Sequence, residues 1–395
     1  MTYERLDSPT GRDGLGRRLA GARSYYDLYG RLLLEVRGEG GRAVEQFRSM
    51  YRRFEVPAPA RRPDVVVERT TDDRVAERAF GGPNDHYGWT GESFVVRRGS
   101  EYMAVRPGWD HIAVTPNFEP FDATYPVEFR LRQRLVEEGR ALVHASGVER
   151  DGVATVFPAW RSAGKTNTLL SLLGDGCGFL ADDRLWLGAD GTAWGYPLAV
   201  NVHPRNVQSF PGVEVEHEDV ESRVREWADQ HIQDRFGSGE SVAEKALSFL
   251  SERFVASSGR NFLDIETAFP EVEYVEEAPV ANVVLLCASP TAERVTVEPV
   301  PAREVAAAIT AIDHYEWNQR LAEYFRAYDA LVGDAAVEEL AHVVEREEQI
   351  VGDVLQHVDT YRAAIPQHLD WAASGLDRAV ADAVRTIQDR QRTAL

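Results

Sequence analysis

Short alternating runs of apolar and polar residues, separated by Gly, Pro and Asn, dominate the first third of the chain and predict strands and tight turns. Tyr25–Val36 favours β structure, and Arg42–Phe54 carries apolar side chains at helical spacing before Pro57-Ala58-Pro59 breaks the chain. Four further strands are predicted, at Asp64–Glu68, Ser93–Arg97, Tyr102–Val105 and His111–Val114. A helix over Val127–Glu138 closes what we expect to be a small, mixed, β-rich unit spanning residues 1–138.

The central part of the chain predicts a strand–loop–helix–strand order. A loop over residues 159–164 lies between a buried strand and a helix that runs from Lys165 to about Leu173. The strands expected in this region are Ala141–Val148, Val153–Phe157, Phe179–Ala181, Arg184–Leu187, Ala281–Ala288 and Arg294–Val297. We therefore expect an α/β (α+β) domain with a mixed central sheet over residues 139–301.

The last part of the chain, residues 302–395, is predicted to be a mostly helical tail. Apolar residues recur there at helical spacing, a stripe that is typical of core packing. The clearest stripe consists of Leu321, Tyr324, Phe325, Tyr328 and Leu331. Such a tail is a candidate lid over a substrate or a candidate surface for assembly of a homo-oligomer.

Charge and composition exclude several kinds of partner. Apolar residues make up 44% of the chain, which is enough for a sizeable core, and the formal net charge is −20. So acidic a protein is poorly suited to bind a nucleic-acid backbone or an anionic membrane surface. The first sixteen residues lack the apolar stretch of a signal peptide, and no apolar run reaches membrane-spanning length. We expect a cytoplasmic protein.

The basic residues are almost all arginine, and the exceptions are informative. Of the 44 lysines and arginines only Lys165 and Lys245 are lysine, and Lys165 lies in the run AWRSAGKT. This run matches the phosphate-binding pattern GxxxxGK[ST] except that Ala159 replaces the first glycine. A flexible ammonium follows a phosphate that is being transferred better than a rigid, planar guanidinium does. Lys245 lies in a charged segment and is predicted to be a solvated position on a helix.

A loop of this kind binds phosphate through inward-turned backbone N–H groups and through the positive end of the following helix. Lys165 would reach the outer phosphates of ATP, and the hydroxyl of Thr166 would coordinate Mg²⁺. The side chains of Trp160 and Arg161 are bulky and should point outward, where Arg161 either adds a phosphate contact or is simply solvated. The residues expected to contact the nucleotide are Ala159, Arg161, Ser162, Ala163, Gly164, Lys165 and Thr166.

Two acidic residues follow the next predicted strand. Asp182 and Asp183 come seventeen and eighteen residues after Lys165, and phosphoryl transfer needs carboxylates to hold Mg²⁺ and to accept the proton of the attacking hydroxyl. His144, on the strand before the loop strand, is a weaker candidate, because a lone histidine in a strand is usually structural. His203 and Arg205 could add positive charge near the phosphates.

Taken together, these motifs resemble the catalytic domain of HPr kinase/phosphorylase, a phosphate-loop kinase family related to PEP carboxykinase. The resemblance rests on His144-Ala-Ser-Gly-Val, Asp151-Gly-Val-Ala, Gly164-Lys165-Thr166 and Leu180-Ala-Asp182-Asp183-Arg184, and on the later stretch Gly259–Phe269. It covers roughly residues 140–310. It implies that Lys165 and Asp182 are catalytic together with His144, and that Thr166 and Asp183 form the metal site.

The sequence departs from the family pattern in three places. The family glutamate that serves the metal falls at Ala256 or Ser257, the loop tip reads Arg161-Ser162, and residues 1–135 show no match to the N-terminal domain of the bacterial enzyme. The resemblance therefore implies an ATP- and Mg²⁺-dependent kinase that acts on a hydroxyl of a metabolite or of a protein serine, with an acceptor other than HPr. The alternatives are an ATP-binding regulatory module without phosphotransfer and, last, a PEP carboxykinase-like enzyme.

Overall fold

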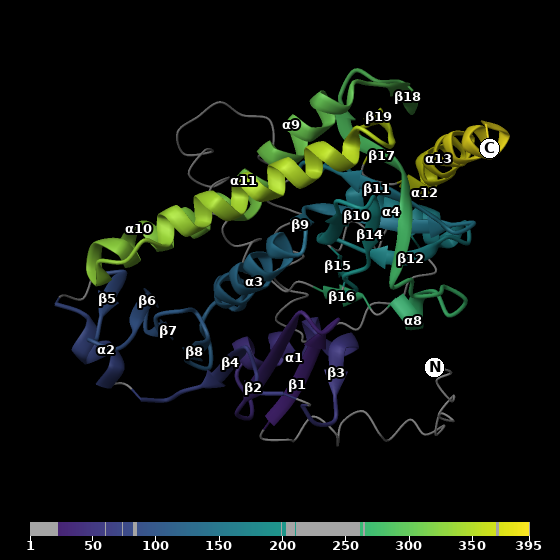
Figure 1. The fold of residues 1–395 in the computed structure, drawn as a ribbon. Helices are drawn as coiled ribbons and strands as arrows, with labels where there is room; N and C mark the ends of the chain where they lie inside the picture. The colour runs from purple at the N-terminus through teal and green to yellow at the C-terminus, as the bar shows by residue number, and fades with distance from the viewer. Residues whose placement is uncertain are drawn as a thin grey trace, which may run out of the picture. The chain divides into compact units, whose positions relative to one another are not determined.

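The structure is a computed structural model, and it describes most of the chain. The described residues are 23–59, 61–72, 74–81, 85–198, 200–202, 210, 261–263, 265–368 and 371–394. Within them the protein is mixed α/β, with two large mixed sheets (Figure 1). Backbone contacts divide the chain into one unit of residues 1–138 with 317–346 and a second unit of residues 139–316 with 347–395. None of the described helices is long and apolar enough to cross a membrane.

The first unit is built on a mixed sheet with the strand order β3-β1-β2-β4-β8-β7-β6-β5. Strand β4 pairs in parallel with β2 and β8, whereas the other neighbours are antiparallel. The strands are β1 Arg23–Leu28, β2 Leu32–Arg37, β3 Glu55–Val56, β4 Val65–Arg69, β5 Tyr87–Trp89, β6 Phe94–Arg98, β7 Glu101–Val105 and β8 His111–Val114. The helices are α1 Arg42–Met50, α2 Arg74–Ala79, α3 Pro120–Glu137 and α10 Gln319–Val332, with the first half of α11 Ala336–Leu355.

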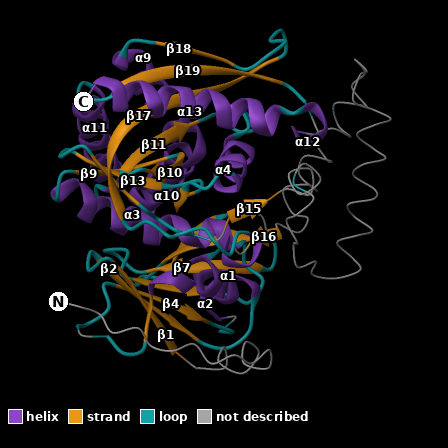
Figure 2. Cartoon of the chain, turned by 90° about the vertical axis from the view of Figure 1, so that its right-hand side faces the viewer, coloured by secondary structure: helices purple, strands orange, loops and turns teal. Residues whose placement is uncertain are grey.

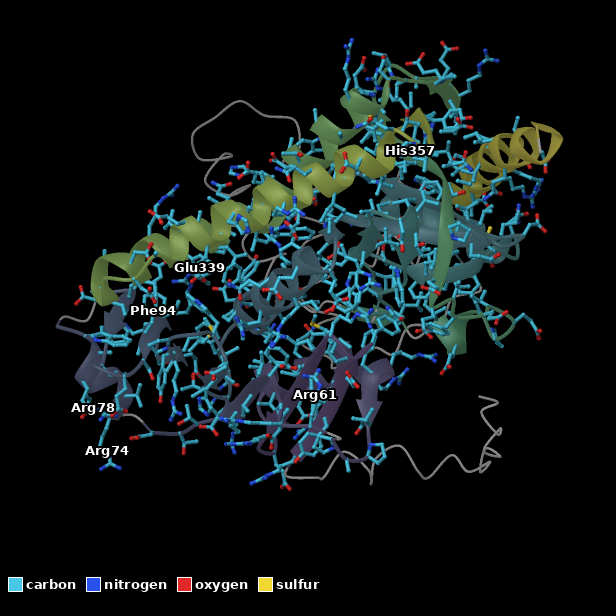
Figure 3. All side chains as sticks on the ribbon, in the orientation of Figure 1. Arg61, Arg74, Arg78, Phe94, Glu339 and His357 are labelled. Atoms are coloured by element: carbon cyan, nitrogen blue, oxygen red, sulfur yellow. The ribbon has the colours of Figure 1, made fainter. Side chains whose placement is uncertain are left out.

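The apolar stripe of α10 forms part of the core of this unit. The ring of Phe325 packs against Trp109 and Phe129, and Tyr328 meets the edge of the buried Phe94, which is labelled in Figure 3. The prediction of core packing is confirmed for this stripe except at its last position, because Leu331 is exposed.

Helix α3 is longer than the sequence predicts. It begins at Pro120, seven residues before the expected start, and contains Pro126 inside the helix. Proline usually ends a helix, since it lacks the N–H donor and its ring crowds the preceding turn. Here Ala123, Val127 and Leu131 are fully buried, and this packing outweighs the local penalty.

The second unit contains a larger, bent sheet (Figure 2). Its path is β12-β10-β11-β17-β14-β13-β9, and β19 adds to β17 and also pairs with β18. The strands are β9 Arg140–Val143, β10 Ala145–Arg150, β11 Val153–Pro158, β12 Gly178–Ala181, β13 Leu185–Gly188, β14 Thr192–Trp194, β17 Glu277–Ser289, β18 Thr296–Pro299 and β19 Asp359–Pro366, with a separate pair β15 Val200–Val202 and β16 Asn261–Leu263. The helices are α4 Lys165–Gly174, α8 Ile265–Ala268, α9 Ala302–Asp313, α12 Trp371–Ser374 and α13 Leu376–Ala394, with the first three residues of a π-helical turn at His314–Asn318 and the second half of α11.

Two features of this unit differ from the sequence-based expectation. The single strand expected over Ala141–Val148 is two strands, β9 and β10, which separate at His144 and pair with different neighbours. The tail from residue 302 is mostly helical, but it contributes the strand β19 to the sheet in parallel with β17. The tail also contributes α13, which packs against α4 through a shared apolar core (Figure 2).

Candidate active site

The candidate phosphate loop connects β11 to α4. Its turn is formed by a hydrogen bond from the N–H of Ala163 to the carbonyl of Trp160, at 3.0 Å, and by two residues with positive φ, Ser162 at 64° and Gly164 at 92°. Gly164 is the N-terminal cap residue of α4, and no side chain caps this helix end in the described part of the protein. A helix leaves its first N–H groups without partners in the helix, so this end is suited to bind an anion.

Buried apolar side chains support the loop from behind. Ala159 forms an isolated parallel bridge with Leu286 of β17, and both Ala159 and Ala163 are buried in the core shared by α4 and α13. Trp371 of α12 belongs to the same core and lies directly against Gly164, where a Cβ atom would come within 2.7 Å of its ring. The positive φ and this close approach together explain why position 164 is glycine.

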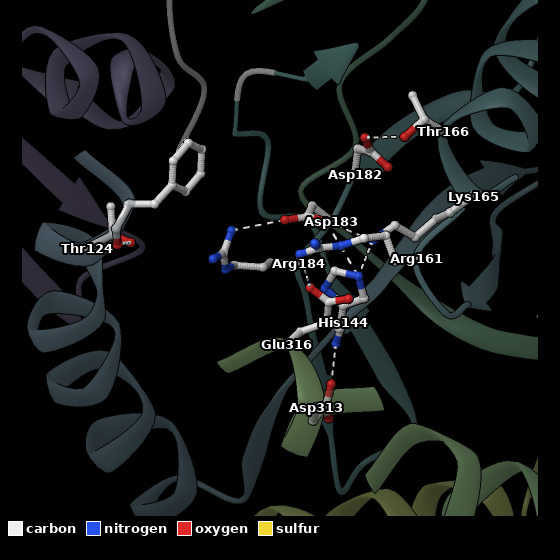
Figure 4. Close-up of polar contacts among 11 residues, drawn as sticks. Thr124, His144, Arg161, Lys165, Thr166, Asp182, Asp183, Arg184, Asp313 and Glu316 are labelled. Carbon is white, nitrogen blue, oxygen red and sulfur yellow. Dashed lines mark hydrogen bonds and ion pairs between the residues drawn. The ribbon is translucent and has the colours of Figure 1, made fainter. Parts of the chain in front are cut away.

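Lys165, the first residue of α4, contacts two of the predicted site residues (Figure 4). Its Nζ lies 2.9 Å from Oδ1 of Asp183 and 2.7 Å from Nε2 of His144. These two partners of Lys165 follow different strands of the sheet, since His144 comes after β9 and Asp183 comes after β12. The fold therefore brings together a cation, a carboxylate and an imidazole that lie up to 39 residues apart in the sequence.

His144 is buried and neutral. Burial, together with the nearby Lys165 ammonium, lowers the pKa of His144 to about 3. Because an ammonium group can only donate, Nε2 of the neutral ring accepts the hydrogen bond from Lys165. The backbone N–H of His144 donates to Oδ1 of Asp313 at 2.8 Å, which fixes the break between β9 and β10.

Asp182 lies beside the hydroxyl of Thr166. Thr166 Oγ1 donates to Oδ2 of Asp182 at 3.1 Å, whereas Oδ1 of the same carboxyl is buried without a hydrogen-bond partner among the described residues. Burial raises the pKa of Asp182 to about 6, against the opposing effect of Lys165. A bound cation would stabilise the ionised form of this carboxyl, which burial disfavours.

Asp183 occupies a strained position between β12 and β13. Its φ is 71°, a conformation that aspartate tolerates better than most residues, and its side chain is 45% exposed. Its second oxygen lies 3.2 Å from a guanidinium nitrogen of Arg184. Desolvation alone would raise the pKa of Asp183, but Lys165 and Arg184 hold it well below its usual value, so the group is an anion near neutral pH.

The loop tip points outward, as the sequence predicts. Arg161 pairs with Glu316 at 3.3 Å, and the ring of Trp160 meets the edge of Tyr315. Glu316 and Tyr315 both belong to the π-helical turn that follows α9. The outward tip therefore has its own contacts within this unit.

The sequence did not indicate four residues that the structure places at the site, namely Arg184, Asp313, Glu316 and Trp371. Arg184 was next to the acid pair and could have been included, whereas the other three lie more than 140 residues from Lys165 and carry no local motif. The expected metal pair, Thr166 and Asp183, is not the pair joined by hydrogen bonds, since Thr166 contacts Asp182. His203, Arg205 and Lys245 lie outside the described residues, as do Ala256 and Ser257.

No model of a known protein family matches this chain, and no curated protein matches it significantly. The described residues contain no group of three or more His, Cys, Asp or Glu side chains that could hold a metal ion. Mg²⁺ needs no such cluster, because it commonly takes one or two carboxylates together with phosphate oxygens and water. The hydroxyl of Thr166 and the buried Oδ1 of Asp182 are hard oxygen ligands of the type it prefers.

Proposed function

We propose that the protein is an ATP-dependent, Mg²⁺-requiring kinase of the HPr kinase-like type, which transfers the γ-phosphoryl group of ATP to a hydroxyl. The observation that carries this proposal is the contact between Lys165, at the start of α4, and Asp183, within one unit and 2.9 Å apart. Phosphoryl transfer needs a cation that stabilises the phosphates and a nearby carboxylate that accepts the proton of the attacking hydroxyl.

In the proposed reaction the oxygen of the acceptor hydroxyl forms a bond to the γ-phosphorus while the bond from that phosphorus to the β-phosphate oxygen breaks. The electron pair of the broken bond stays on ADP, and the hydroxyl proton passes to a carboxylate. Asp183 is the favoured acceptor of this proton, because its side chain is partly exposed beside Lys165. Lys165 would turn from Asp183 toward the phosphates and stabilise their charge during transfer.

Asp182 and Thr166 are the favoured residues to hold Mg²⁺, which would supply neutralisation of the phosphate charge. This assignment exchanges the roles that the family resemblance implies for the two aspartates. It is supported by the hydrogen bond between Thr166 and Asp182 and by the buried Oδ1 of Asp182, which has no hydrogen-bond partner among the residues that the structure describes. His144 would remain neutral and orient the Lys165 ammonium by accepting its hydrogen bond.

An ATP-binding regulatory module without transfer is the second candidate. The observation that favours it is that Lys165 already contacts both Asp183 and His144, so a bound phosphate must compete with Asp183 for the ammonium. Both candidates require the phosphate loop to bind nucleotide, and they differ only in whether an acceptor is phosphorylated.

Binding and transfer can be measured separately. Mg-ATP at about 100 times its dissociation constant should stabilise the purified protein by about 2.7 kcal/mol in chemical denaturation. Lys165→Ala should abolish this stabilisation, while Lys245→Ala, which removes the other lysine of the chain, serves as the matched control. Equal stabilisation of the wild type and Lys165→Ala contradicts nucleotide binding at this loop.

Transfer is tested with γ-labelled ATP and a cell extract. We expect label on an acceptor with the wild type and with Lys245→Ala, and none with Lys165→Ala. Asp183→Asn should keep Mg-dependent ATP binding but lose transfer, whereas Asp182→Asn should lose the Mg²⁺ dependence of binding. Binding without any labelled acceptor supports the regulatory module instead of the kinase.

A further inference from the structure

Two exposed aromatic side chains meet at the tip of the phosphate loop. Among the described residues only three large apolar side chains are exposed, Trp160 at 41%, Tyr315 at 55% and Leu331 at 43%. The rings of Trp160 and Tyr315 lie 5.9 Å apart at an angle of 65°, while Leu331 belongs to α10 in the other unit. Exposed apolar side chains that cluster, unlike scattered ones, indicate a binding surface.

The contacts of the π-helical turn hold this aromatic pair in place. Glu316, the neighbour of Tyr315, pairs with Arg161, the neighbour of Trp160. One residue before the turn, Asp313 accepts the backbone N–H of His144, whose ring contacts Lys165 (Figure 4). The residues next to the aromatic pair therefore connect it, through Asp313 and His144, with Lys165. π-Helical turns are frequent at functional sites.

The position of the pair within the loop indicates which ligand it would contact. In a phosphate loop the helix N-terminus and the lysine hold the phosphates, and the lysine reaches the outermost ones. Trp160 is the second residue of the loop, five residues before Lys165 and the start of α4 in the sequence. A molecule seated on Trp160 and Tyr315 would therefore lie beside the phosphoryl group that is transferred, which is the place of the acceptor.

The charges around the pair favour a neutral acceptor with hydroxyl groups. The guanidinium of Arg161 is 71% exposed, but Glu316 balances its charge, and the chain as a whole carries −20. Among the described residues, the cation at the tip that an anionic acceptor would meet is Arg161, which is already paired. Oε1 of Glu316 is buried without a hydrogen-bond partner among the described residues, and a turn of this carboxylate toward an acceptor hydroxyl would relieve this unfavourable state.

The size of the patch favours a small molecule. A stable protein partner usually covers about 800 Å² on each side of the interface. Two aromatic side chains, with no third exposed large apolar side chain beside them in the described part of the unit, provide only a small part of such an area. Their ring faces suit the C–H face of a saturated ring whose hydroxyls point to Glu316.

We propose that Trp160, Tyr315 and Glu316 form the acceptor site and that the acceptor is a neutral cyclic polyol, either a monosaccharide or an inositol. This inference rests on the proposed kinase function and names its class of acceptor. The phosphoryl group would pass from ATP to a ring hydroxyl, with the proton taken by Asp183 and ADP released.

The test uses the full chain with Mg-ATP and measures ADP release and phosphorylated product for separate acceptors. The panel contains the common hexoses and pentoses, myo-inositol, ethanolamine as a cationic alcohol, and a neutral serine peptide. We expect transfer to a sugar or to inositol. Trp160→Ala and Tyr315→Ala should each raise the KM for that acceptor about tenfold, and leave the KM for ATP within about twofold.

Trp160→Phe keeps a ring and should recover most of the acceptor affinity. Leu331→Ala removes the third exposed large apolar side chain of the described residues and should change neither KM. Transfer only to ethanolamine or to the peptide overturns this inference and leaves the kinase proposal intact. Lys165-dependent ATP binding with no transfer to any member of the panel also overturns it. Loss of Lys165-dependent ATP binding overturns both proposals together.

Discussion

The fit between Gly164 and Trp371 gives a prediction whose size can be worked out from the structure. In Gly164→Ala the new methyl group meets two costs. The backbone φ of 92° is unfavourable for an L-residue by roughly 1–2 kcal/mol. The Cβ atom would also lie 2.7 Å from Cζ2 of the buried Trp371 ring, and overpacking of this kind costs typically about 1–3 kcal/mol.

We therefore expect Gly164→Ala to lower the free energy of unfolding by about 2–5 kcal/mol. Gly176→Ala, just beyond the other end of α4, is the matched control. Its φ is 86°, but apart from its chain neighbours no atom of the described residues lies within 4 Å of the added Cβ, so only the backbone cost of roughly 1–2 kcal/mol remains. The difference between the two variants isolates the contact with Trp371.

Chemical denaturation followed by circular dichroism measures both variants, and Gly164→Ala combined with Trp371→Leu completes a double-mutant cycle. The smaller side chain should relieve the clash, so the double variant should lose about 1–3 kcal/mol less than the sum of the single variants. Equal losses in Gly164→Ala and Gly176→Ala, with additive effects in the cycle, refute the reasoning that Trp371 supports the loop.

Three further predictions concern polar side chains of the same unit. Asp313→Ala should destabilise the protein by about 1–3 kcal/mol in chemical denaturation, because the buried N–H of His144 loses its acceptor. Asp313→Asn keeps an oxygen at this position and should lose less stability. An equal loss of stability in both variants contradicts a role for this hydrogen bond. Asp175→Asn should be less stable than the wild type at pH 7, and the difference should shrink below about pH 4, since its two arginine partners lower the pKa of Asp175 and stabilise only the ionised form. The wild type should lose stability relative to Asp182→Asn as the pH of a metal-free buffer rises from about 4 to about 6. Burial raises the pKa of Asp182 to about 6, so the folded state retains this proton through that range while the unfolded state releases it. A stability difference that does not change between these pH values contradicts the burial argument.

The local elements of the central unit could be predicted from the sequence because they depend on neighbouring residues. The strand before the loop, the loop and the start of α4 at Lys165 all lie where the apolar pattern and the Gly-Lys-Thr run place them. In the first unit the strands at β4, β6, β7 and β8 are confirmed to within one residue at each end. Alternation and turn residues are local signals, and they determine such elements without help from distant parts of the chain.

Predictions failed where a residue's environment comes from far along the chain. Pro126 reads as a helix breaker, yet α3 runs through it because its apolar face is buried. His144 reads as a strand residue, yet the strand breaks there because Asp313, 169 residues later, takes its N–H. The segment at β19 follows a long helix and reads as part of a helical tail, but pairing with β17 makes it a strand.

The sequence by itself determined the candidate chemistry: a lysine after glycine, a threonine, and two aspartates at the end of a strand. Only the tertiary structure decided which side chains meet, because the contacts of Lys165 with His144 and of Thr166 with Asp182 depend on how three strands and a helix are arranged. It also decided the supports of the site, Trp371 behind the loop and the π-helical turn at its tip, since packing joins residues by their distance in space and not by their distance along the chain.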